Sequence, residues 1–249
     1  YIRFNCHGNN QSQWNSISEI EVHKPNNDGV FKVENKGIKF GVENVYVENQ
    51  LMTEIEYAKT TNNTTFANYA DKAGYYFPDG AKTTIFKDNS PTPYMILQIE
   101  HGKNPSNGKY SYAYLPNFTN EQTKEYANNP DIMVIANNKT VQAVTDKTIG
   151  VTGYVFWGKG KADAVEADNT CIVMTRETED EFVLSIAEPT RLARDINLVI
   201  GRGGLEILES ASEITAECKN DSTKINLKIP EYDNGRSYEI KFKKVTKGE

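Results

Sequence analysis

Short runs of alternating or β-branched residues, separated by Asn, Gly, Asp and Pro, constrain the fold of this chain more than any other feature. In 17–22, Ile20 and Val22 fall on one face of an expected strand, and Glu19 and Glu21 fall on the other. This pattern is typical of all-β proteins. We predict strands at 17–22, 37–41, 45–49, 53–58, 73–77, 82–87, 93–100, 110–115, 131–136, 141–146, 150–157, 171–177, 181–187, 196–200, 213–218, 224–229 and 237–244.

One short helix is predicted near 119–128. Thr119 can cap its N-terminus, and Gln122 stands at the capping-box position three residues later. Asn128, Asn129 and Pro130 then end it. The helix interrupts a β fold and does not define it.

Composition narrows the class of partner. The chain has 249 residues, 38% of them hydrophobic, and a formal net charge of −6, which indicates a globular protein and argues against nucleic-acid binding. No apolar run reaches the roughly 18 residues that a membrane span needs. The three cysteines form no C-x-x-C pair, so a zinc or thioredoxin-like site has no support.

The strongest motif lies at 100–116, which reads EHGKNPSNGKYSYAYLP. An acidic-His-Gly start, an Asn/Pro/Gly loop and a Tyr-rich strand ending in Leu-Pro resemble a signature of family 8 polysaccharide lyases, the hyaluronate, chondroitin and xanthan lyases. The helix EQTKEYA and the segments VTGYVFW and EFVLSIAEPT follow in the family's order. Upstream, VENVYVENQ and AGYYFPDG resemble two of its strands, so the resemblance covers about 43–245.

The resemblance implies a large antiparallel β super-sandwich followed by a smaller C-terminal β-sandwich. We expect the super-sandwich at 43–190 and the small domain at 191–249, with a linker and strand at 25–42. The family's catalytic Asn, His and Tyr lie in a helical domain, and nothing in 1–249 has the long helical periodicity of that domain. No catalytic residue is therefore assigned.

Residues 1–24 differ from the rest. YIRFNCHGNNQSQWNSISEIEVH resembles the last two strands of a discoidin-like (coagulation factor type C) carbohydrate-binding domain. Trp14 is a candidate for stacking on sugar, or for packing under the barrel. Glu19 matches a position that helps to hold a structural calcium in some members, but calcium needs six to eight oxygens. The chain opens at Tyr1 in an expected strand, so we expect a fragment of a longer protein.

Tyr110, Tyr112 and Tyr114 alternate along one expected strand face. Such a stripe can stack on sugar rings or pack between two sheets. His101 is a candidate acid or base, or a residue that bonds a loop carbonyl. Glu100 and His101 are adjacent in the chain, so they point to opposite faces and cannot bracket one sugar.

Three further segments have a structural interpretation. Trp157 follows a run of Val and Phe, and we expect it in the core. The segment 201–204, GRGG, lacks the Lys-Ser/Thr of a P-loop and is expected to be a turn. Lys241, Lys243 and Lys244 either meet an anionic chain or protect an edge strand.

The sequence thus favours a non-catalytic β portion of a secreted lyase, which cleaves hyaluronan- or chondroitin-type polysaccharides by β-elimination. Its expected partners are the polysaccharide and the protein's own helical catalytic domain, and we expect the chain alone to be inactive. A stand-alone carbohydrate-binding module is the alternative, and a structural stalk is a third hypothesis. No cofactor is expected apart from the calcium considered at Glu19.

Overall fold

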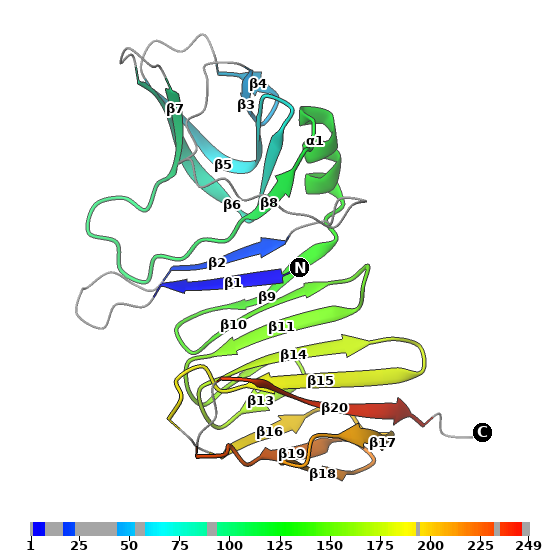
Figure 1. The fold of residues 1–249 in the computed structure, drawn as a ribbon. Coiled ribbons are helices and arrows are strands. Elements are labelled where there is room, and N and C mark those ends of the chain that lie inside the picture. The colour runs from blue at the N-terminus through cyan, green and yellow to red at the C-terminus, as the bar shows by residue number, and fades with distance from the viewer. Residues whose placement is uncertain are drawn as a thin grey trace. The chain divides into compact units, whose positions relative to one another are not determined.

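The computed structural model describes residues 2–7, 17–22, 44–52, 58–88, 94–192, 195–231 and 235–245, the first two ranges as backbone only. The chain divides into two compact units, residues 1–130 and 131–249, and each is described by itself. Both are built mainly from antiparallel strands (Figure 1), so the all-β prediction is confirmed.

The first two strands of unit 1 form a hairpin. β1 (Ile2–His7) pairs antiparallel with β2 (Ile17–Val22), so that Ile2 lies opposite Val22 and His7 opposite Ile17. The strand predicted at 17–22 is confirmed. The discoidin-like character of this hairpin stays a prediction, because the loop 8–16 lies outside the described residues.

The main sheet of unit 1 is built around two long strands. β5 and β6 pair along nearly their whole length, and β6 then uses its other edge twice, for β7 with its second half and for β8 with its first half. β3 and β4 extend the sheet beyond β5. The strands are β3 (Val45–Val47), β4 (Gln50–Leu51), β5 (Ala58–Tyr69), β6 (Ala73–Asp88), β7 (Tyr94–Ile99) and β8 (Ala113–Pro116).

β5 contradicts the hydrophobic-pattern prediction, which placed no strand over 59–69. Its first half is polar, but Thr is a strong strand former, and two Thr–Thr hydrogen bonds cross to β6. The hydroxyl oxygens of Thr64 and Thr83 lie 2.7 Å apart, and both residues are buried. The register shifts between Thr61 and Phe66, and there Gly80 takes a φ of +67° opposite Asn63. This irregularity explains why the pattern indicated two strands where β6 is one.

The predicted helix is present as α1 (Asn120–Asn128), with Thr119 as N-cap and a capping box with Gln122. It lies against the face of the sheet that carries Asn68 and Gly74 (Figure 1). The Asn68 side-chain amide donates to the Thr123 hydroxyl at 2.8 Å, and a Cβ on Gly74 would lie 2.3 Å from that hydroxyl. The helix therefore sits on the sheet at a point where only glycine fits.

The opposite face of this sheet carries the apolar core of unit 1. Its buried members come from β3, β5, β6 and β7, with one more from the residue after β4, and Tyr69, Tyr75 and Tyr112 pack against it partly exposed. The buried residues are Val45, Val47, Met52, Ala67, Phe77, Ile85 and Met95.

Unit 2 is a sandwich of two sheets. One has the strand order β17-β20-β15-β14-β11-β10-β9, and the other β12-β13-β16-β19-β18. In Figure 1 β9, β10, β11, β14 and β15 follow one another as a ladder. The strands are β9 (Ile132–Asn137), β10 (Val141–Asp146), β11 (Val151–Phe156), β12 (Gly160–Ala162), β13 (Val165–Ala167), β14 (Cys171–Glu177), β15 (Glu181–Ala187), β16 (Ile196–Ile200), β17 (Leu205–Ser210), β18 (Ile214–Cys218), β19 (Thr223–Leu227) and β20 (Ser237–Lys244).

A single core joins the two sheets. Leu184 and Ile240 from the first sheet and Leu198 and Ile225 from the second belong to one cluster of buried side chains. The boundary expected near 190 therefore does not separate compact units. The reason is that β20 pairs with β15 over seven residues, which ties the end of the chain to strands that precede 190.

Candidate functional site

A row of five aromatic side chains crosses the β6–β8 part of unit 1. Tyr75 in β6 lies opposite Tyr114 in β8, with ring centroids 5.5 Å apart. The Tyr112 ring centroid also lies 6.2 Å from that of Tyr75, and Tyr110 stacks on Tyr112 at 6.2 Å with an interplanar angle of 16°. His101 follows at 6.0 Å from Tyr110. We call His101, Tyr110, Tyr112, Tyr75 and Tyr114 the aromatic row.

The row is anchored at its centre. Tyr75 and Tyr112 pack against the unit 1 core, and the Tyr112 ring lies 6.5 Å from the buried Phe77 ring. All four tyrosines of the row are partly exposed, whereas His101 is exposed. The rings are thus held by the fold and still reach the surface.

The structure brings the four sequence-predicted residues together in a different way from the one expected. β8 begins at Ala113, so Tyr110 and Tyr112 precede the strand and do not alternate along it with Tyr114. Tyr75 from β6 links Tyr112 with Tyr114, because its ring contacts both of theirs. Only the pairing of β6 with β8 places Tyr75 beside Tyr114, because the two residues are far apart in the chain.

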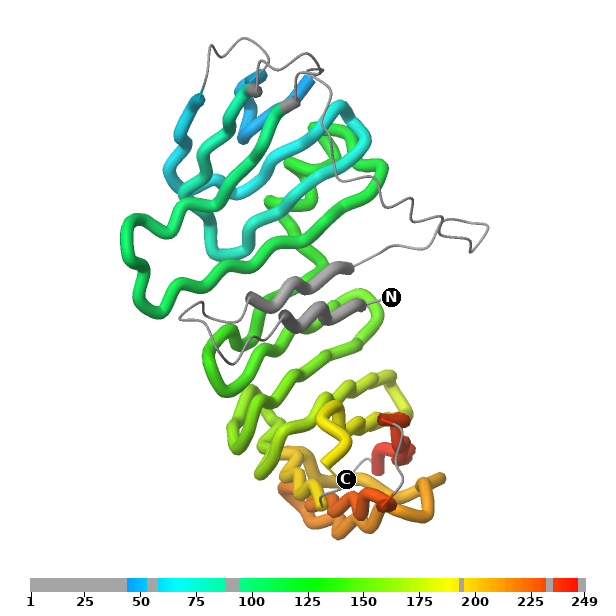
Figure 2. The backbone as a smooth tube through the Cα atoms, turned by 60° about the vertical axis from the view of Figure 1, so that its left-hand side comes forward, coloured from blue at the N-terminus to red at the C-terminus, as the bar shows by residue number. Residues whose placement is uncertain are grey.

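A wide loop at residues 100–112 leads from β7 to β8 (Figure 2). Gly102, Asn104 and Asn107 take φ values of +77°, +52° and +58°, a backbone conformation that Gly and Asn tolerate best. Lys103 and Lys109 are exposed, and neither forms an ion pair with a described residue. The loop therefore presents two lysines beside the His101 end of the row.

Tyr76 points to the other face of the sheet, where its ring meets Tyr126 of α1 edge-on at 5.7 Å. Burial raises the pKa of Tyr76, and the nearby Asp79 carboxylate raises it further. Asp79 also accepts a hydrogen bond from the Ser111 hydroxyl at 3.1 Å. Tyr76 therefore packs between the sheet and α1. The Ser111–Asp79 hydrogen bond holds the segment that precedes β8 against β6.

Two of the candidates cannot be placed. Trp14 lies outside the described residues, and so does the side chain of Glu19. Among the residues that the structure describes, no three or more His, Cys, Asp or Glu side chains gather in a way that could hold a metal ion. Calcium at Glu19 stays a prediction.

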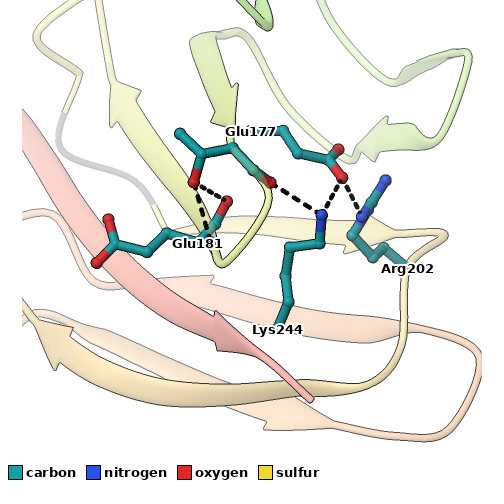
Figure 3. A network of polar contacts seen from close by, with 5 residues as sticks. Glu177, Glu181, Arg202 and Lys244 are labelled. Carbon is teal, nitrogen blue, oxygen red and sulfur yellow. Dashed lines mark hydrogen bonds and ion pairs between the residues drawn. The ribbon is translucent and has the colours of Figure 1, made fainter. Parts of the chain in front are cut away.

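The lysines of β20 do not mark an edge strand, because β20 lies between β17 and β15. The Lys244 ammonium donates to a Glu177 carboxylate oxygen at 3.0 Å and to the Thr178 carbonyl at 2.9 Å. The Arg202 guanidinium reaches the same Glu177 oxygen at 2.6 Å (Figure 3). These contacts join β14, β20 and the loop between β16 and β17, in agreement with a structural turn at 201–204.

Trp157 is also not a core residue. It directly follows Phe156, the fully buried last residue of β11, and its side chain is 36% exposed. The indole N–H donates to the side-chain oxygen of Gln142. In this position the apolar part of the indole is partly covered and its N–H has a hydrogen-bond acceptor.

Part of unit 2 matches a known protein family. Residues 133–197, which run from β9 into β16, match the polysaccharide lyase family 8 C-terminal β-sandwich domain. The chain carries that family 8 domain. Tyr110, Tyr112 and Tyr114 lie upstream of this match, in unit 1.

Lyases of this family resemble much more of the chain. A xanthan lyase of Bacillus sp. (strain GL1) is 34% identical over 189 residues, which is 68% of this chain and 19% of the relative. A hyaluronate lyase of Thermasporomyces composti is 23% identical over 168 residues, or 61% of this chain and 22% of the relative. The solved Paenibacillus xanthan lyase superposes with a TM-score of 0.75 at 26% identity, over 83% of this chain and 22% of that one.

This chain thus spans about a fifth of the lyases that it matches. Within the described part of the chain, no helix is long and apolar enough to cross a membrane.

Proposed function

We propose that this chain is the non-catalytic, β-rich portion of an extracellular polysaccharide lyase, which cleaves a uronic-acid polysaccharide by β-elimination. One observation carries the proposal: most of the chain is similar to about a fifth of a xanthan lyase, in sequence and in fold. Hyaluronate and xanthan lyases are both among its relatives, so the substrate class is an acidic polysaccharide.

The chemistry supports a non-catalytic role. β-Elimination at a uronic acid needs a base at the C5 proton and an acid at the leaving oxygen, both within hydrogen-bond reach of one sugar. His101 and Glu100 are neighbours in the chain, and the His101 ring contacts Tyr110, so this pair does not bracket a substrate. The role of the chain is to brace the helical catalytic domain of the lyase.

The proposal is tested by assaying the purified 249-residue chain on hyaluronan, chondroitin sulfate and xanthan, alone and mixed with the helical portion of the same lyase. Ultraviolet absorbance of the unsaturated uronide reports cleavage. We expect no product from the chain alone and more product from the mixture than from the helical portion alone. Product from the pure chain would overturn the proposal.

A stand-alone carbohydrate-binding module is the second candidate, and the half-exposed aromatic row favours it. This candidate predicts that the chain binds glycans and that no longer form of the protein has lyase activity. A native polypeptide whose helical portion cleaves polysaccharide would exclude this candidate.

A further inference from the structure

The aromatic row has the form of a platform for an extended ligand. Consecutive ring centroids lie 5.5–6.2 Å apart over the five side chains, with no interruption between His101 and Tyr114. Tyrosine offers a large apolar ring face together with a hydroxyl. Pyranose rings present C–H faces that pack on such rings, and a row of rings suits a chain of sugars better than a single one.

The platform exists before any ligand arrives. Tyr75 and Tyr112 rest on the core, and Ser111, between Tyr110 and Tyr112, is hydrogen-bonded to Asp79. A surface whose side chains are already ordered loses little conformational entropy on binding. The partial exposure of the four tyrosines leaves apolar area for a ligand to cover.

Two lysines near the aromatic row favour an acidic sugar as its ligand. The loop 100–112 carries Lys103 and Lys109 and one acidic residue, Glu100, at its start, although the whole chain carries a net charge of −6. One carboxylate bonded to the row's backbone segment, that of Asp79, accepts a hydrogen bond from the Ser111 hydroxyl. Both lysines lie in the exposed part of this loop, before Tyr110. Two cations beside a row of aromatic rings complement a chain that carries carboxylates on some of its sugars.

We propose that the aromatic row, together with Lys103 and Lys109, binds an acidic polysaccharide chain. The sugars stack on Tyr110, Tyr112 and Tyr114, and uronic-acid carboxylates face the two lysines. The acidic nature of the ligand rests on the proposed lyase function as well as on the lysines. This site would hold polysaccharide on the β portion itself, independently of the catalytic domain.

The test is a calorimetric titration of the 249-residue chain with hyaluronan and xanthan oligosaccharides, and with neutral cello-oligosaccharides of similar length. Tyr110→Ala is expected to weaken binding of the acidic sugars about tenfold, equivalent to about 1.4 kcal/mol. Tyr110→Phe keeps the ring and is expected to retain most of the affinity. Because Tyr110 lies outside the strands, circular dichroism should show both variants folded.

The lysines are tested by the double variant Lys103→Gln and Lys109→Gln. We expect roughly threefold weaker binding of the acidic oligosaccharides at low salt, with binding of the neutral ones unchanged. Lys124→Gln on α1 is the matched control, since Lys124 is exposed in the same unit, and it should leave both affinities unchanged.

Acidic-sugar affinity that is absent, or that is the same in Tyr110→Ala as in the native chain, would overturn the inference. The same holds if Tyr110→Ala leaves glycan binding intact and weakens association with the helical portion of the lyase, because the row would then be a packing surface. A longer protein without lyase activity would defeat the proposed function and leave Tyr110-dependent binding standing. Lyase activity without such binding would defeat this inference alone.

Discussion

Glu188 directly follows β15 and is a carboxylate held almost entirely by the turn that follows. It is 1% exposed, and its oxygens accept hydrogen bonds from the Thr190 N–H at 2.8 Å, the Leu192 N–H at 2.9 Å and the Thr190 hydroxyl. Burial acts to raise the pKa of Glu188, but the hydrogen bonds outweigh it, so the pKa is lowered. The turn therefore depends on the ionised form.

Glu188→Gln is expected to destabilise unit 2 by about 1–3 kcal/mol at neutral pH, because an amide N–H₂ replaces one of the accepting oxygens. A lowered folded-state pKa means that the stabilisation is present above the unfolded-state pKa and is lost as the pH falls through the folded-state value. The difference between the native chain and the variant should therefore shrink well below the ordinary Glu pKa of 4.5. Urea unfolding of the native chain and the variant, at neutral pH and at a pH well below 4.5, measures this difference.

Glu179→Gln serves as the control, since Glu179 is exposed on the neighbouring turn and should change the urea midpoint very little. If Glu188→Gln lowered the free energy of unfolding equally at neutral and acidic pH, the carboxylate charge would not have the role proposed for it.

At the scale of elements, the contact between α1 and the sheet depends on one missing side chain. Gly74 lies in β6, and Thr123 of α1 is buried directly against it while it bonds Asn68 and the Thr119 carbonyl. A methyl group on Gly74 would lie 2.3 Å from the Thr123 hydroxyl and 2.9 Å from its methyl carbon. Helix and sheet cannot both stay in place when that space is filled.

Gly74→Ala is therefore expected to cost about 1–3 kcal/mol and to speed amide hydrogen exchange in α1. Gly158→Ala is the control, because a Cβ there meets nothing within 4 Å. Thr123→Ala in the Gly74→Ala background removes the clashing atoms, so the double variant should lose less than the sum of the two single losses. Strict additivity would show that the contact between these two residues is not the cause.

At the scale of the whole molecule, the division of the chain has a direct consequence. The core of unit 2 is drawn from β10 to β20, and Tyr238, Ile240 and Phe242 of β20 are each at most 2% exposed. β20 has its partners β15 and β17 within the same unit. A fragment beginning at 131 thus contains every strand of both sheets, whereas a cut at 190 splits the core.

We expect the fragment 131–249 to fold cooperatively and the fragment 191–249 to stay unfolded. Circular dichroism and dispersion of amide proton signals distinguish the two states. The fragment 131–190, which lacks β16 to β20, is the reciprocal control and should also fail to fold. A folded 191–249 would contradict the single core and restore the boundary near 190.

The sequence by itself determined the fold class, the helix and most strands of unit 2. Several of those strands, such as β16, β19 and β20, alternate between buried and more exposed residues. In β16, Ile196, Leu198 and Ile200 are buried and Asn197 and Val199 are exposed. Others, such as β10, are buried almost throughout. The helix was predictable because its capping signal is local. Hydrophobic alternation could not reveal β5, whose Thr-rich half is held by cross-strand pairs and not by an apolar face.

Only the tertiary structure decided the aromatic row and the division into units. Tyr75 and Tyr114 are 39 positions apart in the chain and become neighbours through the pairing of β6 with β8. Likewise, Glu177 meets Lys244 because β14, β15 and β20 lie in one sheet. Strand pairing between distant segments is set by the burial that the whole sheet achieves, and no local pattern records which strands will be partners.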